Sequence, residues 1–254
     1  MKSPHAKFDL LDVCQHADRA SLGLAAAQCT AGALRRAIAA TGGARVVFAC
    51  APSQDEFLAF LADESVPWEH VTVFHMDEYT GLDAAHPASF RHYLREHLLA
   101  HIPAPRAVHF IHAESADSEC ARYAALLVEA PIDLVCLGIG ENGHLAFNDP
   151  PVADFHDSAL VKCVALDAAC CAQQVNDGCF ATLDLVPAHA LTLTIPALMS
   201  AREISCVVPG ERKAAAVRDA LLGPIRSSCP ASILRTHPRA VLHIDEAAAS
   251  LLPA

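Results

Sequence analysis

The sequence predicts an α/β fold: a mostly parallel, doubly wound (Rossmann-like) sheet with helices on both faces. Short apolar runs alternate along the 254-residue chain with longer stretches of helical composition. Several runs are apolar throughout, which is typical of strands buried on both faces of a parallel sheet. Hydrophobic residues make up 53% of the chain, enough to fill a core, and we expect residues 1–254 to form a single domain.

The first half of the chain supplies alternating strands and helices. A helix over Asp18–Ala40 is expected to stop at Gly42 and Gly43, because glycine readily adopts the backbone conformation that ends a helix. The tetrapeptide Ser53-Gln54-Asp55-Glu56 is a capping box that predicts the start of another helix. The expected strands are Ala44–Cys50, Val71–Met76, Ala107–His112 and Ile132–Leu137, and further helices are expected over Ala88–His101, with Ser89 as N-cap, and over Ala116–Ala130.

The second half continues the alternation. Apolar runs at residues 159–166, 190–195, 203–210 and 240–244 predict further strands. Arg212–Leu222 is expected to be a helix that Gly223 terminates, and Pro150–Asp157 an ordered loop, a candidate lid. Because strands alternate with helices, we expect one largely parallel sheet, with ligands bound at the carboxyl ends of its strands.

Composition excludes several classes of function. A net charge of −11 disfavours binding to nucleic acid, which requires clustered Lys and Arg. No segment has the composition of a signal peptide or a bilayer-spanning helix, so we expect a cytoplasmic protein without a membrane partner. The eleven cysteines include no C-x-x-C pair and are expected to be mostly small buried hydrophobes. Although there are fifteen histidines, His92, His97 and His101 do not share one helical face, and no metal site is expected.

A glycine-rich stretch, LGIGENGHLAFNDP, follows the fourth expected strand. Its glycines, which let the backbone approach a ligand closely, are Gly138, Gly140 and Gly143. His144 lies in the same turn and would project into the crevice, where an imidazole can transfer protons near neutral pH. The alternative is a histidine that only stabilises a tight turn. We disfavour it because the polar side chains of Asn142, Asn148 and Asp149 surround His144.

Two carboxylates follow the second expected strand in the sequence HMDEYTGL. Asp77 comes first after the apolar Met76 and is the candidate base. Glu78 is expected to point the opposite way, since successive side chains of a strand alternate. A purely local role for Asp77 in an Asx-turn is the rival interpretation.

Two further strand ends suggest an anion site. Ser53 precedes a helix N-terminus, where backbone N–H groups and the helix dipole favour a negative group. Lys213 lies in the first turn of the helix after Gly210, where a lysine opposes the dipole unless an anion is near. We prefer a phosphate-binding role for Lys213 over the alternative of a solvent-facing lysine.

These motifs, in this order, resemble the glucosamine-6-phosphate deaminase (isomerase) family, whose fold is shared with 6-phosphogluconolactonases and ribose-5-phosphate isomerases. The resemblance covers most of the chain and rests on MDEY-x-GL with HP-x-SF, G-x-G-x-x-GH-x-AFN-x-P, G-x-x-KA, and Ala231–Ala248. Lactonases share the glycine–histidine turn but lack the pairing of MDEY-x-GL with HP-x-SF. The resemblance therefore favours the deaminase branch of the family.

The resemblance implies that an amino-sugar phosphate is isomerised and loses ammonia. His144 would open the sugar ring, and Asp77 would move a proton from C2 to C1. Ser53 and Lys213 would hold the phosphate, and no metal or organic cofactor is implied. The expected partner is a small phosphosugar, and the chain is expected to be a monomer or a homo-oligomer. Expected catalytic residues are Asp77, His144, Asn142 and Asp149, and expected substrate-binding residues are Ser53, Lys213, Gly138, Gly140, Gly143, Glu78 and Gln174.

The chain departs from the family pattern in three places. Asn142 stands where an aspartate is usual, and Asp149 where a glutamate is usual. An amide raises the basicity of a neighbouring histidine far less than a carboxylate does. Gln174 replaces a phosphate-binding arginine, so we expect Lys213, backbone amides or Arg235 to compensate. A 6-phosphogluconolactonase-type hydrolase and a non-catalytic sugar-phosphate sensor are the alternative functions.

Overall fold

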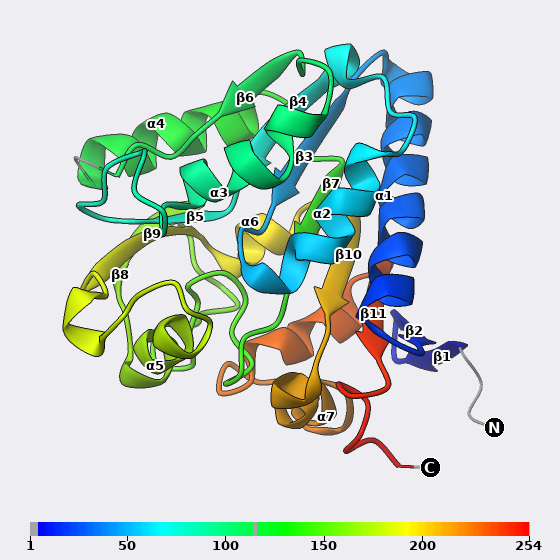
Figure 1. Cartoon of the computed structure of the whole chain (residues 1–254), viewed down its shortest axis with the longest axis vertical. Helices are drawn as coiled ribbons and strands as arrows, with labels where there is room; N and C mark the ends of the chain where they lie inside the picture. The colour runs from blue at the N-terminus through cyan, green and yellow to red at the C-terminus, as the bar shows by residue number, and fades with distance from the viewer. Residues whose placement is uncertain (1–4, 114–115, 254) are drawn as a thin grey trace.

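An eight-stranded sheet forms the centre of the structure, a computed structural model that describes residues 5–113 and 116–253 (Figure 1). Every neighbouring pair in the sheet is parallel except β1–β2. The strands, in spatial order, are β1 (His5–Phe8), β2 (Leu11–His16), β11 (Ala240–Asp245), β10 (Glu203–Val208), β7 (Leu134–Leu137), β3 (Ala44–Phe48), β4 (Val71–His75) and β6 (Ala107–His109). The predicted class, a mostly parallel α/β sheet, is confirmed.

The strand order reverses direction between β3 and β7. From β3 the chain moves outward to β4 and β6, whereas β7 returns beside β3 and the chain then builds β10 and β11 on the other side. In an open parallel sheet this reversal opens a crevice at the carboxyl ends of the two strands. The segments after β3 and β7 are those that carry Ser53 and the glycine turn.

Helices cover both faces of the sheet, as Figure 1 shows for α1 and α4. Alternate residues of β3 separate the two apolar layers. Val46 and Phe48 belong to the cluster that includes residues of α1 and α2, and Val47 to the cluster that includes residues of α4 and α7. The helices are α1 (Arg19–Thr41), α2 (Asp55–Ala62), α3 (Phe90–His97), α4 (Ala116–Val128), α5 (Ala168–Asn176), α6 (Ile195–Met199) and α7 (Ala214–Leu222). None of the helices within the described ranges is long and apolar enough to cross a bilayer.

Two predicted strands do not join the parallel sheet. β8 (Val161–Ala165) and β9 (His189–Leu193) pair antiparallel and form a second sheet with the short β5 (Asp77–Tyr79). The prediction of one largely parallel sheet was wrong here. β8 shows the reason, because only Val161 and Val164 of its five residues are buried, whereas a strand of a parallel sheet covered on both faces is buried almost throughout. The β1–β2 hairpin was also missed, since β1 is short and mostly exposed.

Local details of two predicted helices differ as well. The Ser53 capping box is wrong: Pro52–Gln54 form a 3₁₀ turn, α2 begins at Asp55, and its N-terminus has no side-chain cap. Ser89 does occupy the N-cap position of α3, but its hydroxyl donates to Glu78 instead of capping. The helix expected over Ala88–His101 divides into α3 and the 3₁₀ turn Leu99–His101.

A close approach of α1 and α2 fixes the segment that contributes to the crevice. A Cβ atom on Gly23 would lie 2.8 Å from Cβ and 2.9 Å from the backbone carbon of Glu56. Only glycine allows the helices to approach this closely. Next to this contact, Arg19 donates to the Glu56 carboxylate and to the Pro52 carbonyl oxygen, which holds the loop after β3 against α1.

We expect opposite effects from alanine at two glycines of α1. Gly32→Ala should stabilise the fold by about 0.5–1 kcal/mol through helix propensity, because its Cβ would meet only the flexible end of Arg36, 3.4 Å away. Gly23→Ala gains the same propensity, but overpacking against the α2 backbone should produce a net loss of about 1–3 kcal/mol. Urea unfolding of both variants tests this, and equal shifts would contradict the close-packing argument.

Candidate active site

A pocket opens at the carboxyl ends of the central strands, at the reversal between β3 and β7. Most of the residues that line it follow β3, β4, β7 and β10 or belong to the end of α5 and the segment after it, and Phe90 of α3 adds an aromatic wall. They include Ser53, Gln54, Asp77, Gly138, Gly140, His144, Phe147, Gln173, Gln174, Asp177 and Lys213. The sheet topology thus gathers residues that are up to 160 positions apart in the sequence.

The glycine turn after β7 depends on two glycines for different reasons. Gly143 has a φ of +85°, a conformation that side chains other than glycine rarely adopt, and its N–H donates to the Gly140 carbonyl. At Gly140 the reason is space, since a Cβ there would lie 2.1–2.3 Å from ring atoms of His144. The imidazole therefore lies directly against the Gly140 backbone, where it lines the pocket with only 12% of its side chain exposed.

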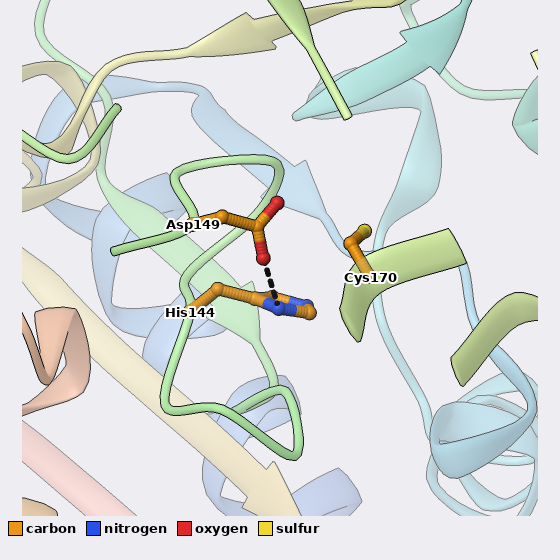
Figure 2. Close-up of side chains that lie close together, drawn as sticks. All are labelled: His144, Asp149 and Cys170. Carbon is orange, nitrogen blue, oxygen red and sulfur yellow. Dashed lines mark ion pairs between the residues drawn. The ribbon is translucent and has the colours of Figure 1, made fainter. Parts of the chain in front are cut away.

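Asn142 and Asp149 hold one nitrogen of His144. Nδ1 lies 2.8 Å from Asn142 Oδ1 and 2.9 Å from Asp149 Oδ1 (Figure 2), and the Asn142 amide donates to the same Asp149 oxygen. Since both partners of Nδ1 are acceptors, Nδ1 carries a proton, and in the neutral ring Nε2 is left with a lone pair. Burial would raise the pKa of Asp149, but the hydrogen bond and charge of His144 outweigh it and hold that pKa below its usual value.

The departure at Asn142 therefore leaves His144 with a carboxylate partner. The sequence placed an amide where the family usually has an aspartate, which suggested a less basic histidine. Asp149, seven residues after Asn142, supplies the charge instead, and Asn142 binds both the ring and Asp149. Neither residue lines the pocket, so both contact the face of His144 turned away from it.

Asp77 presents a poorly solvated carboxylate to the pocket. It is the first residue of β5, lines the pocket and is only 6% exposed. No hydrogen-bond donor within the described residues reaches its carboxylate. Burial, reinforced by the neighbouring Glu78, raises the pKa of Asp77 well above its usual value. Asp77 is thus a carboxylate that binds a proton more strongly than an exposed aspartate does.

Glu78 does not line the pocket, and its expected place among the substrate-binding residues is corrected. Its fully buried carboxylate accepts hydrogen bonds from the hydroxyl of Ser89, from the backbone N–H groups of Tyr79, Phe90 and Arg91, and from the Arg91 guanidinium. Glu78 thereby joins β5 to the first turn of α3 and fixes the backbone beside Asp77. Its side chain does point away from that of Asp77, as strand alternation predicted.

Ser53 and Lys213 face the same pocket. The Ser53 hydroxyl accepts a hydrogen bond from Gln54 Nε2 at 3.0 Å, which leaves its own proton for a ligand. Lys213 ends a 3₁₀ turn directly before α7 and is 9% exposed. Burial lowers the pKa of Lys213, although the charges of Asp177 and Glu141 act in the opposite direction. An anion bound here would favour the charged form of the lysine.

Arg235 does not reach the pocket, which corrects one of the expected substitutes for the family arginine. Its guanidinium donates to the carbonyls of Leu221 and Gly223 and pairs with Asp9. Gln174 does line the pocket, where its amide oxygen accepts a hydrogen bond from the Tyr79 hydroxyl at 2.6 Å.

Sequence reasoning missed several polar residues of the pocket. Gln54, Gln173 and Asp177 line it, and Arg212 binds Asp177 at 2.6 Å at the exposed rim. A signal existed for three of them, because Arg212, Gln54 and Gln173 are each adjacent in the sequence to a predicted site residue. None existed for Asp177, which follows no apolar strand directly. No residue of the expected lid, Pro150–Asp157, lines the pocket.

Comparison with known proteins gives consistent matches. Residues 17–242 match the model of the family described as glucosamine-6-phosphate isomerases/6-phosphogluconolactonase. A glucosamine-6-phosphate deaminase of Listeria monocytogenes is 38% identical over 197 residues, covering 76% of this chain and 81% of the relative. One from Lactobacillus delbrueckii subsp. bulgaricus is 34% identical over 216 residues, covering 83% and 88% of the two chains.

Solved structures agree with these sequence matches. A monomeric glucosamine-6-phosphate deaminase superposes with a TM-score of 0.86 at 30% identity, covering 94% of this chain and 99% of its own. A 6-phosphogluconolactonase of Shewanella baltica has a TM-score of 0.73 at 22% identity, covering 92% and 96%, which is a likeness of fold alone.

The two adjacent carboxylates should respond oppositely to neutralisation. The folded state raises the pKa of Asp77, so Asp77 opposes folding increasingly as pH rises from the unfolded-state pKa, about 4, through the folded-state value. Asp77→Asn removes this penalty and should raise the melting temperature at pH 8. The expected shift is about 2–4 °C for each kcal/mol gained in the free energy of unfolding. The gain should shrink toward pH 4.

Glu78→Gln is the matched comparison. It replaces the buried charge that accepts hydrogen bonds from Arg91, Ser89 and three backbone N–H groups, and should cost about 3–5 kcal/mol. Thermal unfolding between pH 4 and pH 8 measures both variants. A pH-independent effect of Asp77→Asn would show that the Asp77 charge does not strain the fold.

Proposed function

The chain belongs to the glucosamine-6-phosphate isomerase/6-phosphogluconolactonase family, and we propose that it converts an amino-sugar 6-phosphate and water to a ketohexose 6-phosphate and ammonia. Glucosamine 6-phosphate or a close epimer such as galactosamine 6-phosphate would be the substrate. The observation that carries the proposal is that Asp77, with its raised pKa, and His144, with its fixed ring, share one pocket.

His144 would open the pyranose ring. Its Nε2 lone pair accepts the proton of the anomeric hydroxyl, and the resulting imidazolium returns a proton to the ring oxygen as the C1–O5 bond breaks. Asp149 stabilises the positive charge that the ring carries between these two transfers. Contact with Gly140 on one side and with Asn142 at Nδ1 keeps the ring from rotating, so little reorganisation is needed in the reaction.

Asp77 would carry out the isomerisation. Its carboxylate removes the C2 proton of the open-chain aldehyde while O1 gains a proton, which gives an enolamine. Asp77 then delivers the proton to C1 as the amine nitrogen loses one, which leaves a hydroxyl at C1 and an imine at C2. Water then adds to C2 and ammonia departs, so the ketose forms. A carboxylate of raised pKa is a stronger base than an exposed aspartate, which suits it to abstracting a proton from carbon.

Ser53 and Lys213 would bind the phosphate, together with the backbone of Gly138, which lines the same pocket. Arg212 is exposed at the rim and bound to Asp177, so it could add a second positive charge near the phosphate in place of the family arginine that Gln174 replaces. A phosphate is expected to raise the lowered pKa of Lys213.

Two other functions remain as alternatives. A phosphosugar lactonase would need only His144 as a base for water attack, and a sensor would need neither proton transfer. The desolvated Asp77 favours the deaminase, because neither alternative requires a second base. We further propose a cytoplasmic location, as the cysteine content suggests. We also propose a monomer or homo-oligomer without a membrane partner and, because of the net negative charge, without a nucleic-acid partner.

Ammonia release tests the proposal directly. Purified protein is incubated with glucosamine, galactosamine or mannosamine 6-phosphate, and ammonium is measured, with hydrolysis of 6-phosphogluconolactone followed in parallel. One amino-sugar phosphate should release ammonium, and Asp77→Asn should lower that rate at least a thousandfold, since the C2 base is lost. Lactone hydrolysis that survives Asp77→Asn, without ammonium release, would support the lactonase instead.

Exchanging the two partners of His144 tests how the ring is activated. Asn142→Asp alone would face Asp149 with a second carboxylate where the amide now donates, and should lower kcat by about 10–100-fold. Asp149→Asn alone removes the charge and should be at least as harmful. The double variant restores one amide and one carboxylate and should recover part of the loss in kcat with little change in KM. Additive losses would show that Asn142 and Asp149 act independently.

A further inference from the structure

A thiol lies beside the catalytic histidine and its carboxylate. Cys170, in the first turn of α5, is 1% exposed, and one ligand atom each of His144, Asp149 and Cys170 lies within 4.8 Å of the others. Figure 2 shows His144 and Asp149 paired on the glycine turn, with Cys170 beside them on the helix. Among the residues that the structure describes, this is the group of three such side chains that meets the spacing of a metal site.

Asp149 supplies a second, independent observation. Its Oδ1 binds His144 and Asn142, whereas its buried Oδ2 has no partner of good hydrogen-bond geometry in the described part of the chain. The one further donor to this carboxylate among those residues is the Cys170 thiol, a weak donor, whose interaction helps to lower the pKa of Asp149. A carboxylate that is 99% buried and has only a thiol near its second oxygen is poorly compensated. A cation between Oδ2 and the sulfur would satisfy it. Since Cys170 does not line the sugar pocket, the proposed catalysis gives its thiol no role.

The combination of donors selects the kind of cation. Imidazole nitrogen, carboxylate oxygen and thiolate sulfur suit Zn²⁺, with bonds of about 2.0–2.1 Å to nitrogen and oxygen and about 2.3 Å to sulfur, whereas Mg²⁺ and Ca²⁺ prefer oxygen alone. One thiolate and one carboxylate balance the charge of a divalent ion. We propose that His144, Asp149 and Cys170 form an inhibitory site for Zn²⁺ and chemically similar thiophilic divalent cations.

Binding at this site would disable His144. The Cys170 thiol releases its proton to solvent and forms the sulfur–metal bond, while Asp149 coordinates through its carboxylate. If the metal binds Nδ1, the ring proton moves to Nε2, so the nitrogen that faces the substrate changes from proton acceptor to donor. If the metal binds Nε2, that nitrogen is blocked directly. In both cases ring opening stops, so the inhibitory effect rests on the proposed function, whereas metal binding does not.

Cobalt spectroscopy tests binding without reference to activity. Co²⁺ is titrated into the purified, chelator-treated protein, and absorption is followed in the near ultraviolet, where a cobalt–thiolate bond gives a charge-transfer band. The wild type should show this band at one equivalent, Zn²⁺ should abolish it by displacement, and Cys170→Ser should lack it. Cys171→Ser changes the adjacent cysteine, which is outside the cluster, and should keep the band.

Inhibition is measured separately. With the amino-sugar phosphate that releases ammonium, stoichiometric Zn²⁺ should reduce the wild-type rate at least tenfold, a chelator should restore it, and Cys170→Ala should raise the Zn²⁺ concentration for half-inhibition at least tenfold. A band in Cys170→Ser equal to that of wild type, or no band in wild type, would overturn the metal site. A normal band in a protein without deaminase activity would leave the metal site standing and refute the proposed function.

Discussion

The pocket depends on two neighbouring buried carboxylates, of which one is fully hydrogen-bonded and the other is not. Glu78 receives donors from a hydroxyl, three backbone N–H groups and Arg91, so its charge is fully compensated. Asp77, one residue earlier, points to the pocket and has no such donors within the described residues. Because Glu78 joins β5 to α3, it fixes the backbone that carries Asp77. Glu78 thus holds Asp77 in its poorly solvated position.

The glycine turn fixes the position of His144 through close packing of its backbone. Gly140 brings the backbone to the imidazole, Gly143 reverses the chain, and Asn148 ties the turn to β9 through the carbonyl of Leu193. Asn142 and Asp149 then fix which nitrogen of His144 carries the proton. A change in the order of amide and carboxylate along the chain has little consequence for this geometry, since both side chains meet at Nδ1.

The sequence predicted the features that depend on local chemistry. Apolar strands with polar or glycine-rich ends identified the sheet and the segments that carry Asp77, His144, Ser53 and Lys213, because parallel strands place their carboxyl ends along one edge. It failed where a side chain had competing partners. Ser53 had the spacing of a helix cap, yet Gln54 binds its hydroxyl. Arg235 had the right charge, but the carbonyls of Leu221 and Gly223 hold it elsewhere.

Cys170 shows a further limit of prediction from the sequence. No local pattern relates position 170 to position 144, since their proximity arises only when α5 packs beside the glycine turn. Burial shifts Asp77 and Lys213 toward their neutral forms, and it leaves Asp149 with an oxygen that has no partner of good hydrogen-bond geometry in the described chain. Each of these groups would be stabilised by a partner that the folded chain does not provide: a proton or carbon acid for Asp77, an anion for Lys213, a cation for Asp149. The ligands that this region prefers are therefore those that supply the hydrogen bonds and charges that its buried groups lack in the folded chain.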